Sequence, residues 1–172
     1  MPTARHLASR FVGSLSPAGP PPGDEAWVAA LLQPGEAALW WRMGGADRRH
    51  AVGVARRAQA LLGAEATRPV LAAALLHDVG KVDRGLGPVG RSLATVAGLV
   101  AGHGAATRWA DRPGVPGRVG RYLCHDRIGA DLLAEAGSDP LTVAWAAEHH
   151  LAPARWTVPR LVGEALKAAD DD

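Results

Sequence analysis

His77 and Asp78 stand side by side at the end of an apolar run, where an imidazole and a carboxylate are costly without a partner. The six residues from Val70 to Leu75 carry no polar side chain, which predicts a helix buried around most of its circumference. Polar groups carried into a core need hydrogen bonds, an ion pair or a metal ion. Imidazole beside carboxylate is a ligand pair that suits Zn, Fe, Mn or Ni. The pair therefore predicts either a metal site, or a satisfied core histidine followed by an aspartate that caps the next turn.

Further histidines and carboxylates stand at the ends or edges of other predicted helices, namely His50, His125, the pair His149-His150, and Asp170. Each has a simpler explanation when taken alone. His50 can be an exposed histidine of an arginine-rich helix, and Asp170 can begin a solubilising acidic tail. Asp126, directly after His125, is interpreted as a helix cap. As a set, these residues supply the nitrogen and oxygen ligands that divalent metals take in proteins.

The elements that must bring these residues together are all predicted to be helices. We expect helices over residues 24–32, 34–43, 47–63, 67–78, 89–101, 128–136, 139–149 and 159–169, with a short helix ending over 121–124. Asp47 and Asp139 are expected to cap two of them, Trp27, Trp40 and Trp41 to pack on the core, and Leu61 and Leu62 to face it. No segment shows the sustained alternation of a strand. The predicted fold class is all-α, a helical bundle with two extra N-terminal helices.

Length and composition limit the remaining possibilities. At 172 residues with 48% hydrophobic residues, the chain can hold one domain with a real core. We expect a flexible, proline-rich tail over 1–23, a helical extension over 24–46 and the main domain over 47–172. The single cysteine, Cys124, allows no intrachain disulfide. Neither a signal peptide nor a membrane-spanning apolar run is apparent, so a soluble cytoplasmic protein is expected.

The cationic charge is carried almost entirely by arginine, since Lys81 and Lys167 are the only lysines. Six arginines lie between Arg84 and Arg121, against the single acid Asp111. Such a segment beside a metal site produces a positive field that attracts an anionic substrate, and the arginine fork suits phosphate. The alternative is a solvated surface that contacts nucleic acid without specificity.

The order of the motifs resembles the HD-domain metal-dependent phosphohydrolase superfamily, an all-helical family named after its adjacent His-Asp. The resemblance runs from about Asp47 to Asp170. The matching motifs are His50 early in a helix, His77-Asp78-x-Gly80-Lys81, His125-x-x-x-Gly129-Ala130, His149-His150, and Ala169-Asp170. One such motif is weak, but five in the family's order are strong.

The resemblance implies a binuclear metal site. Carried over by position, His50, His77, Asp78 and Asp170 hold one divalent ion. Asp78 bridges to a second ion, which His125 and His149 also hold. Fe or Mn is favoured, with Zn, Ni or Mg as alternatives. Asp78 and Lys81 are the expected catalytic residues, and the expected substrate contacts are Lys81, His150, Arg84, Arg91 and Arg121.

The resemblance also orders the possible functions. A phosphodiesterase of the HD-GYP type is disfavoured because Leu151 to Ala154, after His149-His150, contain no Gly-Tyr-Pro. The pattern is more similar to small bacterial binuclear hydrolases that cleave nucleotides, including diadenosine tetraphosphate. We therefore expect hydrolysis of a nucleotide or another small phosphate ester by metal-activated water. The alternatives are an HD-fold di-iron oxygenase, as in myo-inositol oxygenase, and a non-catalytic module that binds a nucleotide or a partner protein. The expected partner is a small anionic phosphate, with no specific nucleic acid and no membrane; a homodimer is left open.

Overall fold

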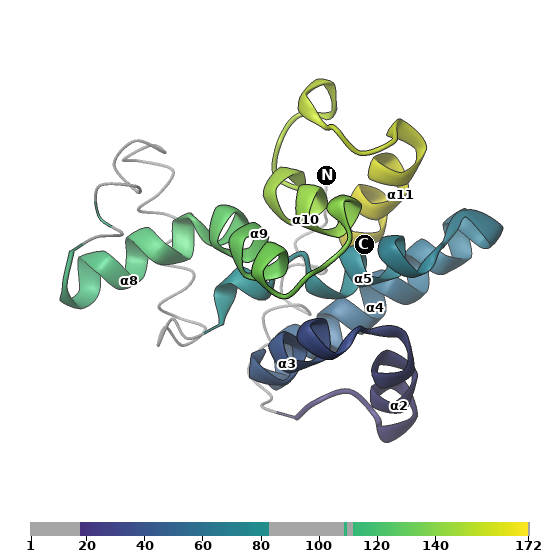
Figure 1. The fold of residues 1–172 in the computed structure, drawn as a ribbon, viewed down its shortest axis with the longest axis horizontal. Coiled ribbons are helices and arrows are strands. Elements are labelled where there is room, and N and C mark those ends of the chain that lie inside the picture. The colour runs from purple at the N-terminus through teal and green to yellow at the C-terminus, as the bar shows by residue number, and fades with distance from the viewer. Residues whose placement is uncertain (1–17, 83–108, 110–111, 172) are drawn as a thin grey trace, which may run out of the picture.

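The computed structural model describes residues 18–82, 109 and 112–171, and over these residues the chain forms helices joined by short connections, with no strand (Figure 1). This confirms the predicted all-α class. The α-helices are α2 (Pro22–Leu31), α3 (Pro34–Arg42), α4 (Gly45–Leu62), α5 (Arg68–Leu76), α8 (Gly114–Leu123), α9 (His125–Glu135), α10 (Pro140–Glu148) and α11 (Arg160–Asp171). Three short 3₁₀ helices are η1 (Gly63–Glu65), η2 (Val79–Lys81) and η3 (Pro153–Arg155).

Helix α5 is the central element of the fold. Every residue from Val70 to Leu76 is buried, as the absence of polar side chains predicted. Pro69 lies in the first turn, where a missing backbone N–H costs nothing. The helix packs against α4, α10, α3 and α2. Because α5 is covered on all these sides, the polar residues that follow it, His77 and Asp78, are delivered into the interior.

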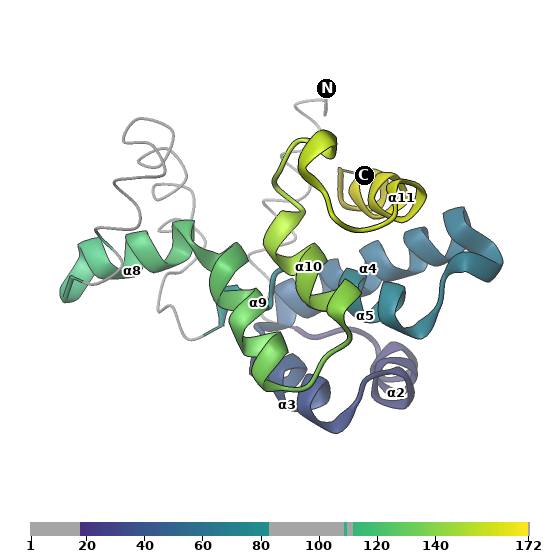
Figure 2. The same ribbon diagram turned by 45° about the horizontal axis from the view of Figure 1, so that its top comes forward.

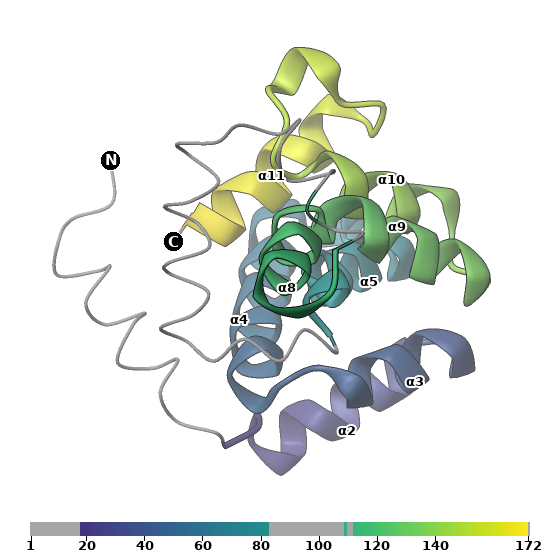
Figure 3. The same ribbon diagram turned by 90° about the vertical axis from the view of Figure 1, so that its left-hand side faces the viewer.

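The other helices surround α5 in two groups. Helix α11 packs along α4, on the opposite side of the α4–α5 pair from α2 and α3 (Figures 1 and 3). Helices α9 and α10 pack on each other, and α9 also contacts η2 directly after α5. Helix α8 extends from α9 away from the rest of the described chain (Figure 2). The C-terminal ends of α5, α10 and α11 and the N-terminal end of α9 are therefore brought toward one region.

Helix boundaries follow local signals in some places and not in others. The Asp139 side chain accepts a hydrogen bond from the Leu141 backbone N–H at 2.9 Å, with Pro140 at the first helical position, as predicted. The prediction for Asp47 was wrong: α4 begins at Gly45 and Asp47 lies in its first turn. There the carboxylate still suits the positive end of the helix dipole. Asp126 likewise lies inside the first turn of α9, whose N-cap is Cys124.

Adjacent apolar residues divide between the core and the surface. Trp40 is buried, whereas its neighbour Trp41 is 53% exposed and lies beneath the Arg48 guanidinium. Leu62 is buried, whereas Leu61 is 60% exposed. The predictions that Trp41 and Leu61 face the core were wrong because successive residues of an α-helix point about 100° apart. One helix face therefore cannot bury both members of such a pair.

Val28 of α2, Leu32 directly after it, and Leu39 and Trp40 of α3 belong to the same hydrophobic cluster as residues of α4 and α5. The division of the chain at residues 23 and 46 stays a prediction. The helix expected over 89–101 lies outside the described residues. None of the helices that the structure describes is both long and apolar enough to span a membrane.

Candidate metal centre

The six predicted metal ligands converge from separate helices. His50 lies in the second turn of α4, His77 directly follows α5, and Asp78 precedes η2. His125 is the first residue of α9, His149 directly follows α10, and Asp170 lies in the last turn of α11. Residues spread over more than a hundred positions thus surround one point, with Asp78 between the others.

The first group of ligands comes from α4, the end of α5 and α11; we call His50, His77 and Asp170 the α4–α11 half. The His50 Nε2 lies 2.9 Å from the Asp170 Oδ1. The His77 Nε2 lies 3.7 Å from the same oxygen and 3.5 Å from the Asp78 Oδ2. Two ligand atoms bound to one ion at about 2.1 Å lie roughly 3.0–3.5 Å apart at tetrahedral or octahedral angles, so this spacing fits one ion.

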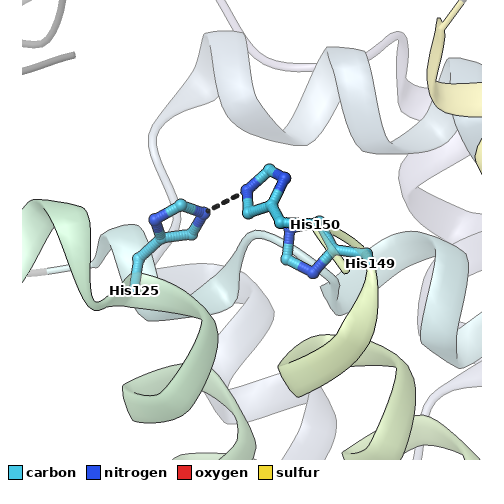
Figure 4. Close-up of side chains that lie close together, drawn as sticks. All are labelled: His125, His149 and His150. Carbon is cyan, nitrogen blue, oxygen red and sulfur yellow. Dashed lines mark hydrogen bonds between the residues drawn. The ribbon is translucent and has the colours of Figure 1, made fainter. Parts of the chain in front are cut away.

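The second group comes from α9 and α10; we call His125, His149 and His150 the α9–α10 half. The Asp78 Oδ1 lies 3.4 Å from the His125 Nε2 and 3.8 Å from the His149 Nε2. The His150 Nε2 lies 3.1 Å from the His125 Nε2, so the two rings point toward each other (Figure 4). His149 is buried, but His150 is exposed. The ligand atoms of these three histidines lie within 4.8 Å of one another, as do those of His50, His77 and Asp78.

The Asp78 carboxylate is divided between the two halves. Its Oδ2 faces His77 in the α4–α11 half and accepts a hydrogen bond from the Lys81 Nζ at 2.5 Å. Its Oδ1 faces His125 and His149 in the α9–α10 half. One oxygen toward each set of histidines is an arrangement in which a carboxylate can bridge two metal ions.

Backbone carbonyls fix the tautomers of the two most buried histidines. The His77 Nδ1 lies 2.9 Å from the Ala74 carbonyl oxygen, and the His149 Nδ1 lies 2.9 Å from that of Ala146. Because a carbonyl only accepts, each Nδ1 must be the donor, so the lone pair of the ring in its neutral form is on Nε2. The His149 Nε2 is buried without a hydrogen-bond partner. A metal ion would satisfy that atom, and a donor to a backbone carbonyl is the usual support of a metal-bound histidine.

The electrostatics keep the carboxylates charged and His149 neutral. Burial raises the pKa of Asp78, but the nearby Lys81 and His77, together with a hydrogen bond from His125, outweigh it and hold that pKa well below the usual value. Burial likewise opposes ionisation of Asp170, and the hydrogen bond from His50 with the charge of His77 outweighs it, so its pKa is also lowered.

The pKa values of His149 and His150 are both lowered, which favours their neutral forms. Burial, with the repulsion of His77 and His150, lowers the pKa of His149 to about 3. His150 is exposed as a whole, but its ring is partly buried against His125, and this partial burial together with the charge of His125 lowers the pKa of His150 to about 4. Deprotonated imidazoles and ionised carboxylates are the forms that bind metal. The donor set of histidine nitrogens and carboxylate oxygens suits Fe, Mn, Zn or Ni, so the residues present fit divalent metal.

The remaining predicted site residues are only partly described. Lys81 lies at the centre, against Asp78. Arg84 and Arg91 lie outside the described residues, as does the side chain of Arg121 in α8. One supporting residue was missed: the Arg57 Nε donates a hydrogen bond to the Ala169 carbonyl oxygen at 2.8 Å, next to Asp170. The arginine-rich pattern of α4 did not indicate this role of Arg57, because such a pattern predicts an exposed side chain.

Comparison with known proteins agrees with this geometry. The model of the HD domain family matches residues 48–171, and the chain therefore belongs to the HD domain family. That family consists mostly of metal-dependent hydrolases, its superfamily is that of metal-dependent phosphohydrolases, and its members bind divalent metals. No curated protein and no solved structure matches the chain.

Proposed function

We propose that this chain is a metal-dependent phosphohydrolase that hydrolyses a nucleotide or another small phosphate ester at a two-metal site. The observation that carries the proposal is the position of Asp78, with one carboxylate oxygen toward His77 and the other toward His125 and His149. A carboxylate that only capped a turn would not need nitrogen ligands on both sides.

In this proposal His50, His77, Asp78 and Asp170 hold one ion, and Asp78, His125 and His149 hold the other. Fe or Mn is favoured, and Zn, Ni or Mg are alternatives. When bound, a pair of divalent ions polarises the phosphoryl oxygens and lowers the pKa of bound water toward neutrality. The chain's own part is to keep the Asp78 carboxylate ionised and, through the Nδ1 hydrogen bonds to the Ala74 and Ala146 carbonyls, to leave the Nε2 atoms of His77 and His149 as the ligand atoms.

Lys81 and His150 are the residues that we assign to the substrate side. Lys81 donates a hydrogen bond to the Asp78 Oδ2, which fixes the carboxylate. In this proposal the same ammonium group also contacts the substrate phosphate. His150 is exposed at the edge of the α9–α10 half, with its Nε2 toward His125. Exposure beside a buried ligand suits contact with a substrate that arrives from solvent. We further propose that Arg84, Arg91 and Arg121 attract and hold the phosphate.

The test is release of phosphate from a panel of nucleotides and simple phosphate esters by protein loaded with Mn²⁺ or Fe²⁺. Asp78→Asn is expected to abolish hydrolysis, because the carboxylate is shared by both ligand groups. Asp131→Asn is the matched control, since Asp131 is exposed on α9. Equal hydrolysis by wild type and Asp78→Asn would exclude the proposed site.

The same panel separates the alternative functions. Activity that needs iron and consumes oxygen would indicate a di-iron oxygenase, whereas turnover with Mn²⁺ or Mg²⁺ without oxygen would exclude it. Tight binding of a nucleotide without turnover under any metal would indicate a non-catalytic binding module.

A further inference from the structure

The 3₁₀ helix η2 and helix α9 meet backbone to backbone at two glycines. A Cβ atom added to Gly80 would lie 1.8 Å from the His125 carbonyl oxygen and 2.6 Å from the Gly129 backbone nitrogen. A Cβ atom added to Gly129 would lie 3.0 Å from the Gly80 nitrogen. Real side chains do not approach a backbone at 1.8 Å, so the present distance between η2 and α9 requires glycine at position 80.

The two glycines lie close in sequence to two of the proposed ligands. Gly80 is two residues after Asp78, and Gly129 is one helical turn after His125. The atom that Gly80 faces most closely is the carbonyl oxygen of His125 itself. If η2 moved away from α9, the distance between the Asp78 Oδ1 and the His125 Nε2, now 3.4 Å, would therefore increase.

Helix propensity does not explain Gly129. Glycine inside a helix is about 1 kcal/mol less favourable than alanine. Gly129 is in the middle of α9, with an ordinary helical backbone, because the positive φ values among the described glycines are at Gly63, Gly114 and Gly137. The physical reason left for glycine there is the close approach of η2.

We propose that the Gly80–Gly129 contact sets the distance between Asp78 and His125, and thereby decides whether the α9–α10 half holds a metal ion. The inference rests on the proposed two-metal site. Gly80 and Gly129 are positioning residues, since they touch neither metal nor substrate. The first ion depends less on this contact, because three of its four proposed ligands, His50, His77 and Asp170, come from α4, the end of α5 and α11 rather than from η2 or α9.

The experiment compares Mn²⁺ binding by wild type, Gly80→Ala, Gly129→Ala and the control Gly23→Ala. Gly23 lies in α2, where an added Cβ meets nothing within 4 Å. Elemental analysis after equilibration with Mn²⁺ alone counts the equivalents. Electron paramagnetic resonance distinguishes an exchange-coupled pair of Mn²⁺ ions from an isolated ion, independently of activity.

Wild type and Gly23→Ala are expected to bind two equivalents as a coupled pair. Gly80→Ala is expected to retain one equivalent with the signal of an isolated ion. Gly129→Ala, in which η2 must shift by only a few tenths of an ångström, should bind the second ion about 10- to 100-fold more weakly, the usual cost of losing a support of a metal ligand. If circular dichroism shows that Gly80→Ala does not fold, the affinity of Gly129→Ala for the second ion alone tests the proposal.

The outcomes separate this inference from the proposed function. Two coupled equivalents in wild type and unchanged second-ion affinity in Gly129→Ala would overturn the role of the glycines and leave the two-metal site intact. Fewer than two equivalents in wild type would overturn the two-metal site itself, and with it this inference.

Discussion

The two halves of the candidate site are built by different means. In the α4–α11 half, two proposed ligands satisfy each other, since the His50 Nε2 lies 2.9 Å from the Asp170 Oδ1. The Arg57 Nε donates a hydrogen bond to the neighbouring Ala169 carbonyl oxygen. In the α9–α10 half, the buried His149 Nε2 has no hydrogen-bond partner, and His150 is exposed.

The difference lies in what keeps each half in place. Hydrogen bonds between side chains and from Arg57 to the backbone join α4 to α11, whereas close backbone packing joins α9 to η2. The first half can therefore keep its shape without an ion, while the second leaves one buried nitrogen unsatisfied, which costs free energy until a ligand arrives. We expect the two halves to respond separately to substitution.

The largest effect is expected at the residue that the halves share. Asp78→Asn keeps the shape of the side chain but removes the charge that faces both sets of histidines. We expect loss of both metal equivalents and of all measurable hydrolysis. Elemental analysis beside a phosphate-release assay checks this, with Asp131→Asn as the control. Retention of one tightly bound equivalent would mean that Asp78 serves only one half.

The next effect separates the halves. His77→Ala is expected to remove the equivalent of the α4–α11 half, and His125→Ala that of the α9–α10 half, so each variant should retain about one. Each variant loses a nitrogen that lies 3.4–3.5 Å from an Asp78 oxygen. Metal counting of the purified variants checks this. One equivalent in wild type, unaffected by His125→Ala, would indicate a mononuclear site.

The unsatisfied histidine of the α9–α10 half predicts a pH dependence of the metal-free protein. Burial lowers the pKa of His149 from 6.5 to about 3. The unfolded chain therefore binds more protons than the folded chain between these values. The free energy of unfolding should fall as the pH drops from about 6.5, by up to about 1.4 kcal/mol per pH unit for a single group.

Urea denaturation of metal-free protein at pH 7, 6 and 5 measures this slope. His149→Gln removes the titrating ring and should reduce the slope relative to wild type. An equal slope in the two proteins would assign the acid sensitivity to other groups.

A smaller effect is expected at Arg57, which supports only the α4–α11 half. Arg57→Ala removes the hydrogen bond that holds the last turn of α11 beside Asp170. We expect the affinity of the first ion to fall about tenfold, with that of the second unchanged. Arg56→Ala is the matched control, since the Arg56 guanidinium contacts Asp24 and the Trp27 ring instead. Competition titration with a metal chelator checks both, and equal affinities would leave Arg57 without a role at the site.

The smallest effect is expected at His150. Because this side chain is exposed, His150→Ala should leave two metal equivalents and raise KM by a few-fold with little change in kcat. Steady-state kinetics and metal counting on one preparation check both parts. Loss of an equivalent would instead make His150 a ligand, completing a group with His125 and His149.

The apolar run before His77 and the order of the histidine and aspartate motifs were enough to predict the all-α class and the HD domain family. A continuous apolar segment permits few structures other than a buried helix. Signals on single residues were less reliable. Asp139 caps α10 as predicted, but Asp47 lies inside α4, and Trp41 and Leu61 are exposed. Which neighbour faces the core depends on the rotation of the whole helix against its partners.

The amino-acid sequence alone specifies the chemical groups, which are imidazoles and carboxylates at helix ends and glycines at positions 80 and 129. Their arrangement in space comes from the packing of the helices. This packing turns one Asp78 oxygen toward each group of histidines and leaves the buried His149 Nε2 without a hydrogen-bond partner. It also brings Arg57 to the end of α11 and Gly80 against the His125 carbonyl. These are contacts between residues far apart in the chain. Local sequence patterns carry the spacing within one helix, but distances between helices arise only when their faces pack together.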